Sequence, residues 1–234
     1  MKPPKISSNL PNKGFVLCSR GDIEPKHAKI PIKKGWQKNL NLIKEAAETH
    51  LGKGFNVGLL CGEPNDIVVL DCDRAELAEE ALKSLPETYT QKSANRGLPQ
   101  MFFKILGFRS NINILSKDGD PKNSYGQVLA DRKQCIIAPS TIKKGGGIIH
   151  YEVVKDVPVT EITAEQLLAV VNNFPNTLQK KQEIQPSQDQ GSSDISSIPI
   201  RQVIDLPGFT KSGDELYGAH PTHGSEGGKN FWVG

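Results

Sequence analysis

The stretch that organises the chain runs from residue 56 to residue 73 and reads Asn-Val-Gly-Leu-Leu-Cys-Gly-Glu-Pro-Asn-Asp-Ile-Val-Val-Leu-Asp-Cys-Asp. Two apolar, strand-like runs, at residues 57–61 and 67–70, flank a Gly-Glu-Pro-Asn turn, and we expect them to form a hairpin. Asp71 and Asp73 follow the second run. Because side chains alternate along a strand, both carboxylates are expected on one face, with Cys72 on the other.

Two ionised carboxylates on one face repel each other, and a divalent cation makes such a pair tolerable. Mg²⁺ prefers carboxylate oxygens together with substrate phosphates, so the pair predicts a metal-dependent phosphoryl-transfer site at Asp71 and Asp73. Two simpler interpretations stay open. Asp73 can cap a helix beginning near Arg74, and Asp71 can be an exposed residue at a strand end.

The 234 residues have the composition of a soluble globular protein, with 36% hydrophobic and 24% charged residues. No apolar run approaches the length of a membrane span and the N-terminus shows no signal-peptide pattern, so no membrane association is expected. The cysteines stand singly and are expected to be reduced core thiols of a cytoplasmic protein: Cys18, Cys61, Cys72 and Cys135.

Positive charge is concentrated near the N-terminus, although the net charge is only +3. Residues 1–38 contain nine lysines and arginines against two acidic residues. Such a segment can follow a phosphate backbone. Solvated lysines on a surface loop explain the same pattern, so charge alone leaves a nucleic-acid partner undecided.

The remaining pattern predicts an α+β fold, because helices and strands do not alternate as they do in a doubly wound sheet. Helices are expected at residues 39–51, 74–85 and 163–173, the last beginning with a capping box of Thr163 and Gln166. The inner face of the second helix is expected to comprise Ala78, Ala81, Leu82 and Leu85. Strands are expected at residues 15–18, 89–92, 100–106, 112–115, 125–130, 135–138 and 148–153.

Composition divides the chain into three predicted parts. Residues 1–176 form the folded domain. Residues 177–199, a polar Gln/Ser/Lys run, form a disordered, flexible linker, and residues 200–234 form a short tail.

Further landmarks lie on either side of the two apolar runs. Gly-Trp-Gln at residues 35–37 follows a basic loop that contains proline, and Ala-Pro-Ser at residues 138–140 precedes a Gly-rich turn and Tyr151. Together with the Asp-x-Asp, these landmarks resemble the primase–polymerase (Prim-Pol) domain of the archaeo-eukaryotic primase superfamily, of the plasmid, viral and archaeal type. The resemblance covers about residues 13–175.

The resemblance implies an RRM-like mixed or antiparallel sheet flanked by helices, with Asp71 and Asp73 as the family's first motif. The second motif is a histidine that meets the phosphates of the incoming nucleotide, and its position falls on Gln100. The third motif is another acid, and its position falls on Gln127, with Asp131 close by. The implied catalytic set is therefore Asp71, Asp73, Gln127 and Asp131.

The implied activity is that of a DNA primase and DNA polymerase, which performs template-directed nucleotidyl transfer in DNA replication with Mg²⁺ or Mn²⁺. The implied partners are nucleotide triphosphates and a single-stranded DNA template or primer. Gln100 can donate a hydrogen bond to a phosphate of the nucleotide, although it carries no charge. Arg96 can supply positive charge to the nucleotide, and Ser140 can contact a phosphate. Both can equally be ordinary turn residues.

The tail contains Gly-Ala-His-Pro-Thr-His-Gly-Ser at residues 218–225 and then a Phe-Trp-Val run. It resembles the first half of a zinc-ribbon-like module that follows Prim-Pol domains in some primase–helicase chains. His220 and His223 would be half of a tetrahedral Zn²⁺ site, completed only in a longer chain that also carries a replicative helicase. A mobile Gly/His loop is the alternative.

Two other functions fit part of the pattern. A catalytically degenerate Prim-Pol domain would bind DNA or nucleotides without polymerising, because Gln100 and Gln127 replace a histidine and an acid. A haloacid-dehalogenase-like phosphatase also begins with Asp-x-Asp after an apolar strand, where the first aspartate is the nucleophile. That fold requires a parallel sheet and a later acidic pair.

Overall fold

The computed structural model describes residues 4–116, 118 and 123–178, and also residues 210–212, 215–218 and 231–233. The chain divides into two units, residues 1–185 and 186–234, which are described separately. Within the described residues, no helix combines the length and the apolar character needed to cross a membrane.

The first unit is built around a large sheet whose central strand is β3 (Ile67–Cys72). This strand lies antiparallel between β5 (Pro99–Lys104) and β7 (Gly126–Leu129). The other strands of this sheet are β4 (Thr90–Lys92), β6 (Ile112–Ile114), β11 (Glu152–Lys155) and β12 (Thr160–Glu161). Only β12 pairs in parallel, with β5, so the expected α+β fold with a mostly antiparallel sheet is confirmed.

A second, smaller sheet has the order β1 (Phe15–Arg20), β2 (Phe55–Leu60), β8 (Gln134–Ile136). The prediction that the two apolar runs form a hairpin is therefore wrong, because β2 and β3 lie in different sheets. A single bridge between Gly62 and Ile67 links the ends of the two runs. Both runs are almost entirely buried, so neither shows the apolar–polar alternation that would identify a pairing partner.

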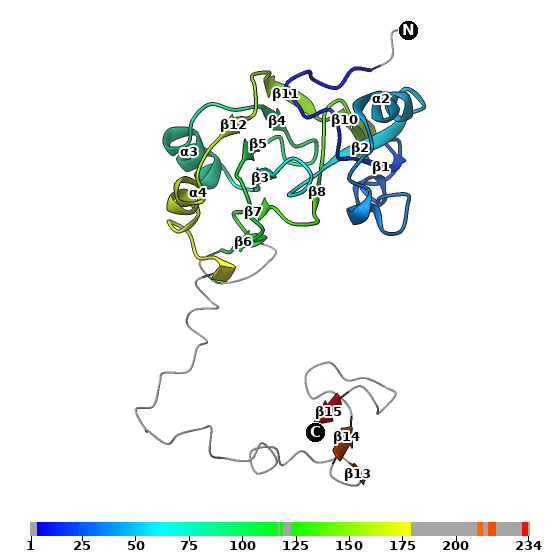
Figure 1. The fold of residues 1–234 in the computed structure, drawn as a ribbon. Helices are drawn as coiled ribbons and strands as arrows, with labels where there is room; N and C mark the ends of the chain where they lie inside the picture. Colours follow the sequence, from blue (N-terminus) through cyan, green and yellow to red (C-terminus); the bar gives the residue numbers. More distant parts are fainter. Residues whose placement is uncertain are drawn as a thin grey trace. The chain divides into compact units, whose positions relative to one another are not determined.

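Two helices, α3 (Ala75–Ser84) and α4 (Ala164–Val171), lie together on one side of the large sheet (Figure 1). The predicted capping box of Thr163 and Gln166 is present at the start of α4. In α3 the inner face differs from the prediction, since Leu82 is 52% exposed and Leu77 is buried instead. Leu77 is four positions before Ala81, so it shares the buried stripe.

The helix predicted at residues 39–51 is shorter than expected, because α2 begins only at Lys44 and ends at Gly52. It packs on β1 and β2 of the small sheet (Figure 1). Two short helical turns precede it, α1 (Pro25–Ala28) and η1 (Trp36–Lys38).

The strand predicted at residues 148–153 is two strands. β10 (Gly147–His150) pairs with β9 (Thr141–Lys144) in a two-stranded ribbon, whereas β11 pairs with β4 in the large sheet. Tyr151, buried between β10 and β11, marks the change from one sheet to the other.

The two faces of β3 point into different cores. Val68, Leu70 and Cys72 belong to the cluster that includes residues of α3 and α4, whereas Ile67 and Val69 belong to the cluster shared with the small sheet. Asp71 continues the second set and faces the small sheet. All four cysteines are unpaired and buried, which confirms the prediction of core thiols.

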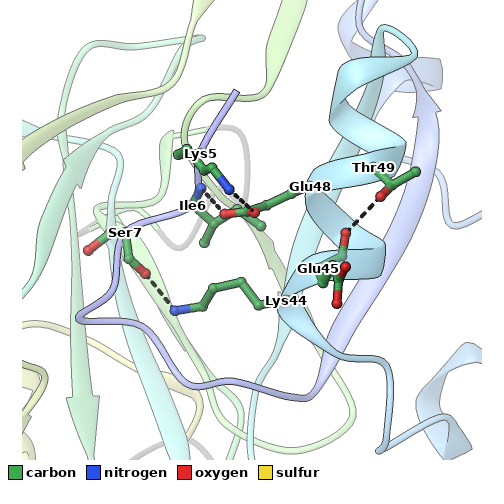
Figure 2. A network of polar contacts seen from close by, with 7 residues as sticks. All are labelled: Lys5, Ile6, Ser7, Lys44, Glu45, Glu48 and Thr49. Atoms are coloured by element: carbon green, nitrogen blue, oxygen red, sulfur yellow. Dashed lines mark hydrogen bonds and ion pairs between the residues drawn. The ribbon is translucent and has the colours of Figure 1, made fainter. Parts of the chain in front are cut away.

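An N-terminal segment lies along α2 and is held by side chains of that helix (Figure 2). The carboxylate of Glu48 accepts hydrogen bonds from the Lys5 ammonium and the Ile6 N–H, each 3.0 Å long. The Lys44 ammonium donates to the Ser7 carbonyl oxygen at 2.8 Å. The same segment buries Ile6 and Leu10 in the core cluster that includes residues of α2 and the small sheet.

The second unit contains a three-stranded antiparallel sheet of β13 (Thr210–Ser212), β14 (Glu215–Gly218) and β15 (Phe231–Val233). His220 and His223 lie outside the described residues, as does the predicted linker from residue 179 onward. The zinc-ribbon-like tail therefore stays a prediction.

Candidate active site

A row of five polar residues crosses the large sheet near the end of β3, one from each of five neighbouring strands. In the strand register, Asp71 lies between Gln100 and Gln127, and the row continues to Gln91 on one side and Asn113 on the other. Directly opposed residues in paired strands project to the same face. The row therefore lies on the face that meets the small sheet.

The two glutamines beside Asp71 both donate hydrogen bonds to its carboxylate. The Nε2 atom of Gln100 lies 2.9 Å from Oδ1, and the Nε2 atom of Gln127 lies 3.2 Å from Oδ2. Each carboxylate oxygen thus accepts one amide N–H. Both positions that the family resemblance selected lie next to Asp71, and both carry a neutral donor in place of a charged group.

Asp73 lies just beyond the end of β3 and is paired with an arginine. Arg96, in the connection between β4 and β5, has Nη1 3.2 Å from Oδ1 of Asp73 and donates to its carbonyl oxygen at 3.0 Å. The residue at the N-cap of α3 is Arg74, and no side chain caps that helix. The interpretation of Asp73 as a helix cap is therefore wrong.

Burial raises the pKa of Asp71, although the two glutamine hydrogen bonds and the positive charges of Lys29 and Arg96 oppose the effect. Burial and the charge of Asp71 raise the pKa of Asp73, again against Arg96 and Lys29. Each carboxylate is therefore harder to ionise than in water. A cation bound between them would offset both the burial and the mutual repulsion.

Lys29 and Gln91 are two members of the site that the sequence analysis missed. Lys29 was counted only as part of the basic N-terminal segment, and its charge acts on both aspartates. Gln91 is fully buried next to Gln100. The strand that carries Gln91 reads Thr-Gln-Lys, so no sequence signal separates Gln91 from a surface residue. The pairing register was needed to place it in the row.

Asp131 does not join the site, contrary to the prediction. The register along β7 runs from Gln127 opposite Asp71 toward Leu129 opposite Val69, so Asp131 lies near the other end of β3. Four strand residues span about 13 Å, which separates Asp131 from Asp71.

Ser140 is also placed differently from the prediction of a phosphate contact. It is 1% exposed, and its hydroxyl donates to the Val57 carbonyl oxygen at 3.2 Å and accepts the Val57 N–H at 3.0 Å. These two bonds use the hydroxyl to hold β2. No surface is left for a nucleotide.

A pocket of about 670 Å³ lies where the loop at residues 35–40 faces the connection between β7 and β8. Three cationic side chains line it: Lys38, Arg109 and Arg132. Two acidic side chains, Glu63 and Asp131, also line it, and Arg109 is paired with Asp66 at 2.8 Å. Its charged lining suits a ligand that carries both phosphates and polar groups.

The described residues contain no group of three or more His, Cys, Asp or Glu side chains able to hold a metal ion. Asp71 and Asp73 alone would supply two carboxylates. Such a donor set fits a hard cation such as Mg²⁺ or Mn²⁺, which keeps waters and takes further oxygens from a bound phosphate. It does not fit Zn²⁺ in a closed structural site.

An α+β fold with a mostly antiparallel sheet, and with two aspartates one residue apart at the end of its central strand, fits a nucleotidyltransferase of the primase and polymerase type. The comparison of sequences agrees: the family described as "Bifunctional DNA primase/polymerase, N-terminal" (Prim-Pol) matches residues 10–165. The chain belongs to the Prim-Pol family, which confirms the resemblance seen in the sequence. A search of curated proteins found no match.

Proposed function

We propose that the first unit is a DNA primase and polymerase domain that performs template-directed nucleotidyl transfer with Mg²⁺ or Mn²⁺ at Asp71 and Asp73. Family membership implies primase/polymerase-type nucleotidyl transfer in general terms. The observation that carries the specific proposal is the pair of carboxylates at the end of β3, both under the influence of Lys29 and Arg96. Asp71 and Asp73 would hold such ions, which would supply activation of the attacking hydroxyl and charge stabilisation for the departing pyrophosphate.

Each residue of the site has a separate role in this proposal. Asp71 and Asp73 provide the oxygen ligands, and Arg96 provides a cation for the triphosphate beside them. Gln100 is 5% exposed, so it supports Asp71 and does not contact the nucleotide directly. Gln127 is partly exposed and keeps its amide beside Asp71.

The proposed partners are nucleotide triphosphates and a single-stranded DNA template or primer. The pocket lined by Lys38, Arg109 and Arg132 supports a polynucleotide, because these side chains can pair with phosphates. A replicative helicase belongs to the same proposal and rests on the family resemblance. A cytoplasmic location belongs to it as well and rests on the four unpaired cysteines.

Primer extension on a single-stranded template tests the proposal. We expect incorporation with Mn²⁺ or Mg²⁺ that is lost with EDTA and lost in Asp71→Ala and Asp73→Ala. Glu161→Gln is a matched control, because Glu161 is an acid of the same sheet whose side chain is 54% exposed and pairs with Lys104. Incorporation that survives in both aspartate variants would overturn the proposal.

A second candidate is the degenerate Prim-Pol domain that binds DNA or nucleotides without polymerising. It is favoured by the lack of a third acidic ligand among the described residues. This candidate predicts DNA or triphosphate binding in wild-type protein with no incorporation under any metal condition. The same primer-extension assay, run beside a binding assay, separates the two.

The phosphatase alternative does not agree with the fold. In that fold the strand bearing Asp-x-Asp belongs to a parallel sheet, whereas β3 is antiparallel to both of its neighbours. The antiparallel direction of the strands on both sides of Asp71 therefore excludes this candidate.

A further inference from the structure

The orientation of Gln91 is fixed by backbone groups. Its Oε1 atom accepts the Ala138 N–H at 2.9 Å, and its Nε2 atom donates to the Ile136 carbonyl oxygen at 2.6 Å. A backbone N–H can only donate and a carbonyl oxygen can only accept. The amide of Gln91 therefore cannot turn over without losing both bonds.

This orientation determines the orientation of the next amide in the row. The Nε2 atom of Gln91 also lies 2.7 Å from Oε1 of Gln100, so this oxygen must be the acceptor. The Nε2 atom of Gln100 is then left facing Asp71, at 2.9 Å from Oδ1. Both glutamines are buried, so water cannot replace either bond readily.

Gln127 differs from Gln100 in this respect. Among the described residues, its amide has one hydrogen-bond partner, the carboxylate of Asp71. It is also partly exposed, whereas Gln100 is buried. The amide of Gln100 is therefore held at both its oxygen and its nitrogen, whereas the amide of Gln127 is held only by its bond to Asp71.

We propose that Gln91 is a positioning residue of the active site, which holds Gln100 as a permanent donor to Asp71 and so fixes the carboxylate for cation binding. Gln91 lies one strand further from the metal ligands than Gln100 and acts through it. The inference deepens the proposed function, because it assumes that Asp71 binds the cation. It also assigns a role to Gln100 that requires no charge.

The test is Mn²⁺ binding, measured by calorimetry without DNA or nucleotide, in wild-type protein and in Gln91→Met. Methionine keeps the length of the side chain and removes both polar ends. We expect the dissociation constant to rise about tenfold, the effect of losing one well-placed hydrogen bond to a charged group. In a Gln100→Met background, Gln91→Met should add nothing, because its effect passes through Gln100.

Asn56→Leu is the matched control for a purely structural effect. Asn56 is also a buried amide that bonds backbone groups, accepting from the Thr141 N–H at 2.9 Å and donating to the Ala28 and Thr141 carbonyl oxygens. The control should lower stability and leave Mn²⁺ affinity unchanged. Equal affinity losses in Asn56→Leu and Gln91→Met, or none in Gln91→Met, would overturn the inference.

A measurement on wild-type protein covers the case in which Gln91→Met does not fold. The side-chain amide protons of Gln91 and Gln100 should exchange with solvent far more slowly than those of Gln127 in NMR spectra without metal. Fast exchange at Gln100 would contradict the inference. If wild-type protein binds no Mn²⁺ through Asp71, the proposed function fails, while the exchange rates still decide whether Gln100 is held.

Discussion

The Nε2 atom of Gln100 lies 2.9 Å from Oδ1 of Asp71. The resemblance to Prim-Pol domains implies a histidine at this position. A histidine there could carry a positive charge to a phosphate, whereas a buried amide stays neutral at every pH. The positive charge of the site comes instead from Lys29 and Arg96, which act on both aspartates. Both cations lie outside the strands of the large sheet, Lys29 after α1 and Arg96 between β4 and β5.

Asp71→Asn is expected to make the metal-free protein more stable at neutral pH. The pKa of Asp71 is raised in the folded state, mainly by burial, so folding disfavours the ionised form. The stability deficit of wild-type protein should grow as pH rises from the ordinary carboxyl pKa of about 4 through the raised value, and then stay constant. Thermal unfolding in EDTA at several pH values measures it. A variant less stable than wild type at pH 7 would contradict the expectation.

Adding Mn²⁺ should make wild-type protein more stable than Asp71→Asn. A cation that binds only the folded state at 100 times its dissociation constant stabilises by about 2.7 kcal/mol. The free energy of unfolding of wild-type protein should rise by this amount, and that of Asp71→Asn should rise little. Mn²⁺ affinity should increase as the pH rises through the raised pKa values of Asp71 and Asp73, because the ion competes with protons for both carboxylates. Calorimetry at a series of pH values provides the measurement.

Gly62→Ala should destabilise the first unit by about 2 kcal/mol or more. Gly62 has φ of +81°, and a Cβ atom there would lie 2.3 Å from the Ala130 carbonyl oxygen. This glycine lets the chain pass from the small sheet to β3 close beside the end of β7. Gly52→Ala is a control at a glycine with open space around it, and it should change the urea midpoint little.

Glu48→Gln should weaken the attachment of the N-terminal segment to α2 (Figure 2). Burial opposes ionisation of Glu48, but hydrogen bonds from Lys5 and the Ile6 N–H outweigh it and hold the pKa below its ordinary value. The contribution is therefore present above the ordinary carboxyl pKa and lost as pH falls through the lowered value. We expect a cost of about 0.5–1 kcal/mol at pH 7, since Lys5 is exposed, and a smaller cost as the pH falls through the lowered pKa of Glu48. Urea unfolding at pH 7 and at a series of lower pH values checks this.

Local features were the part of the fold that could be predicted from the sequence. The capping box at Thr163 and Gln166 lies within one helical turn, and the alternation of β3 needs only one strand. The partner of β2 could not be predicted, because a strand buried on both faces gives no sign of which sheet it joins. The polar row containing Gln91 could not be predicted either. Its members lie far apart in the chain, and their alignment depends on the register of four strand pairs.

Lys38→Ala and Arg132→Ala should each weaken binding of single-stranded DNA, if the pocket between the loop at residues 35–40 and the turn after β7 receives its phosphates. A lost phosphate contact on a single strand releases fewer counterions, so the slope of log K against log salt should fall by about 0.7 per variant. The effect should be similar for templates of different sequence, because phosphates carry no base information.

Lys83→Ala is the matched control, since Lys83 is an exposed lysine of α3, which packs on the other face of the large sheet. Fluorescence anisotropy at several salt concentrations gives the slopes. An unchanged slope in both pocket variants, with wild-type DNA binding intact, would show that the strand takes another path across the surface.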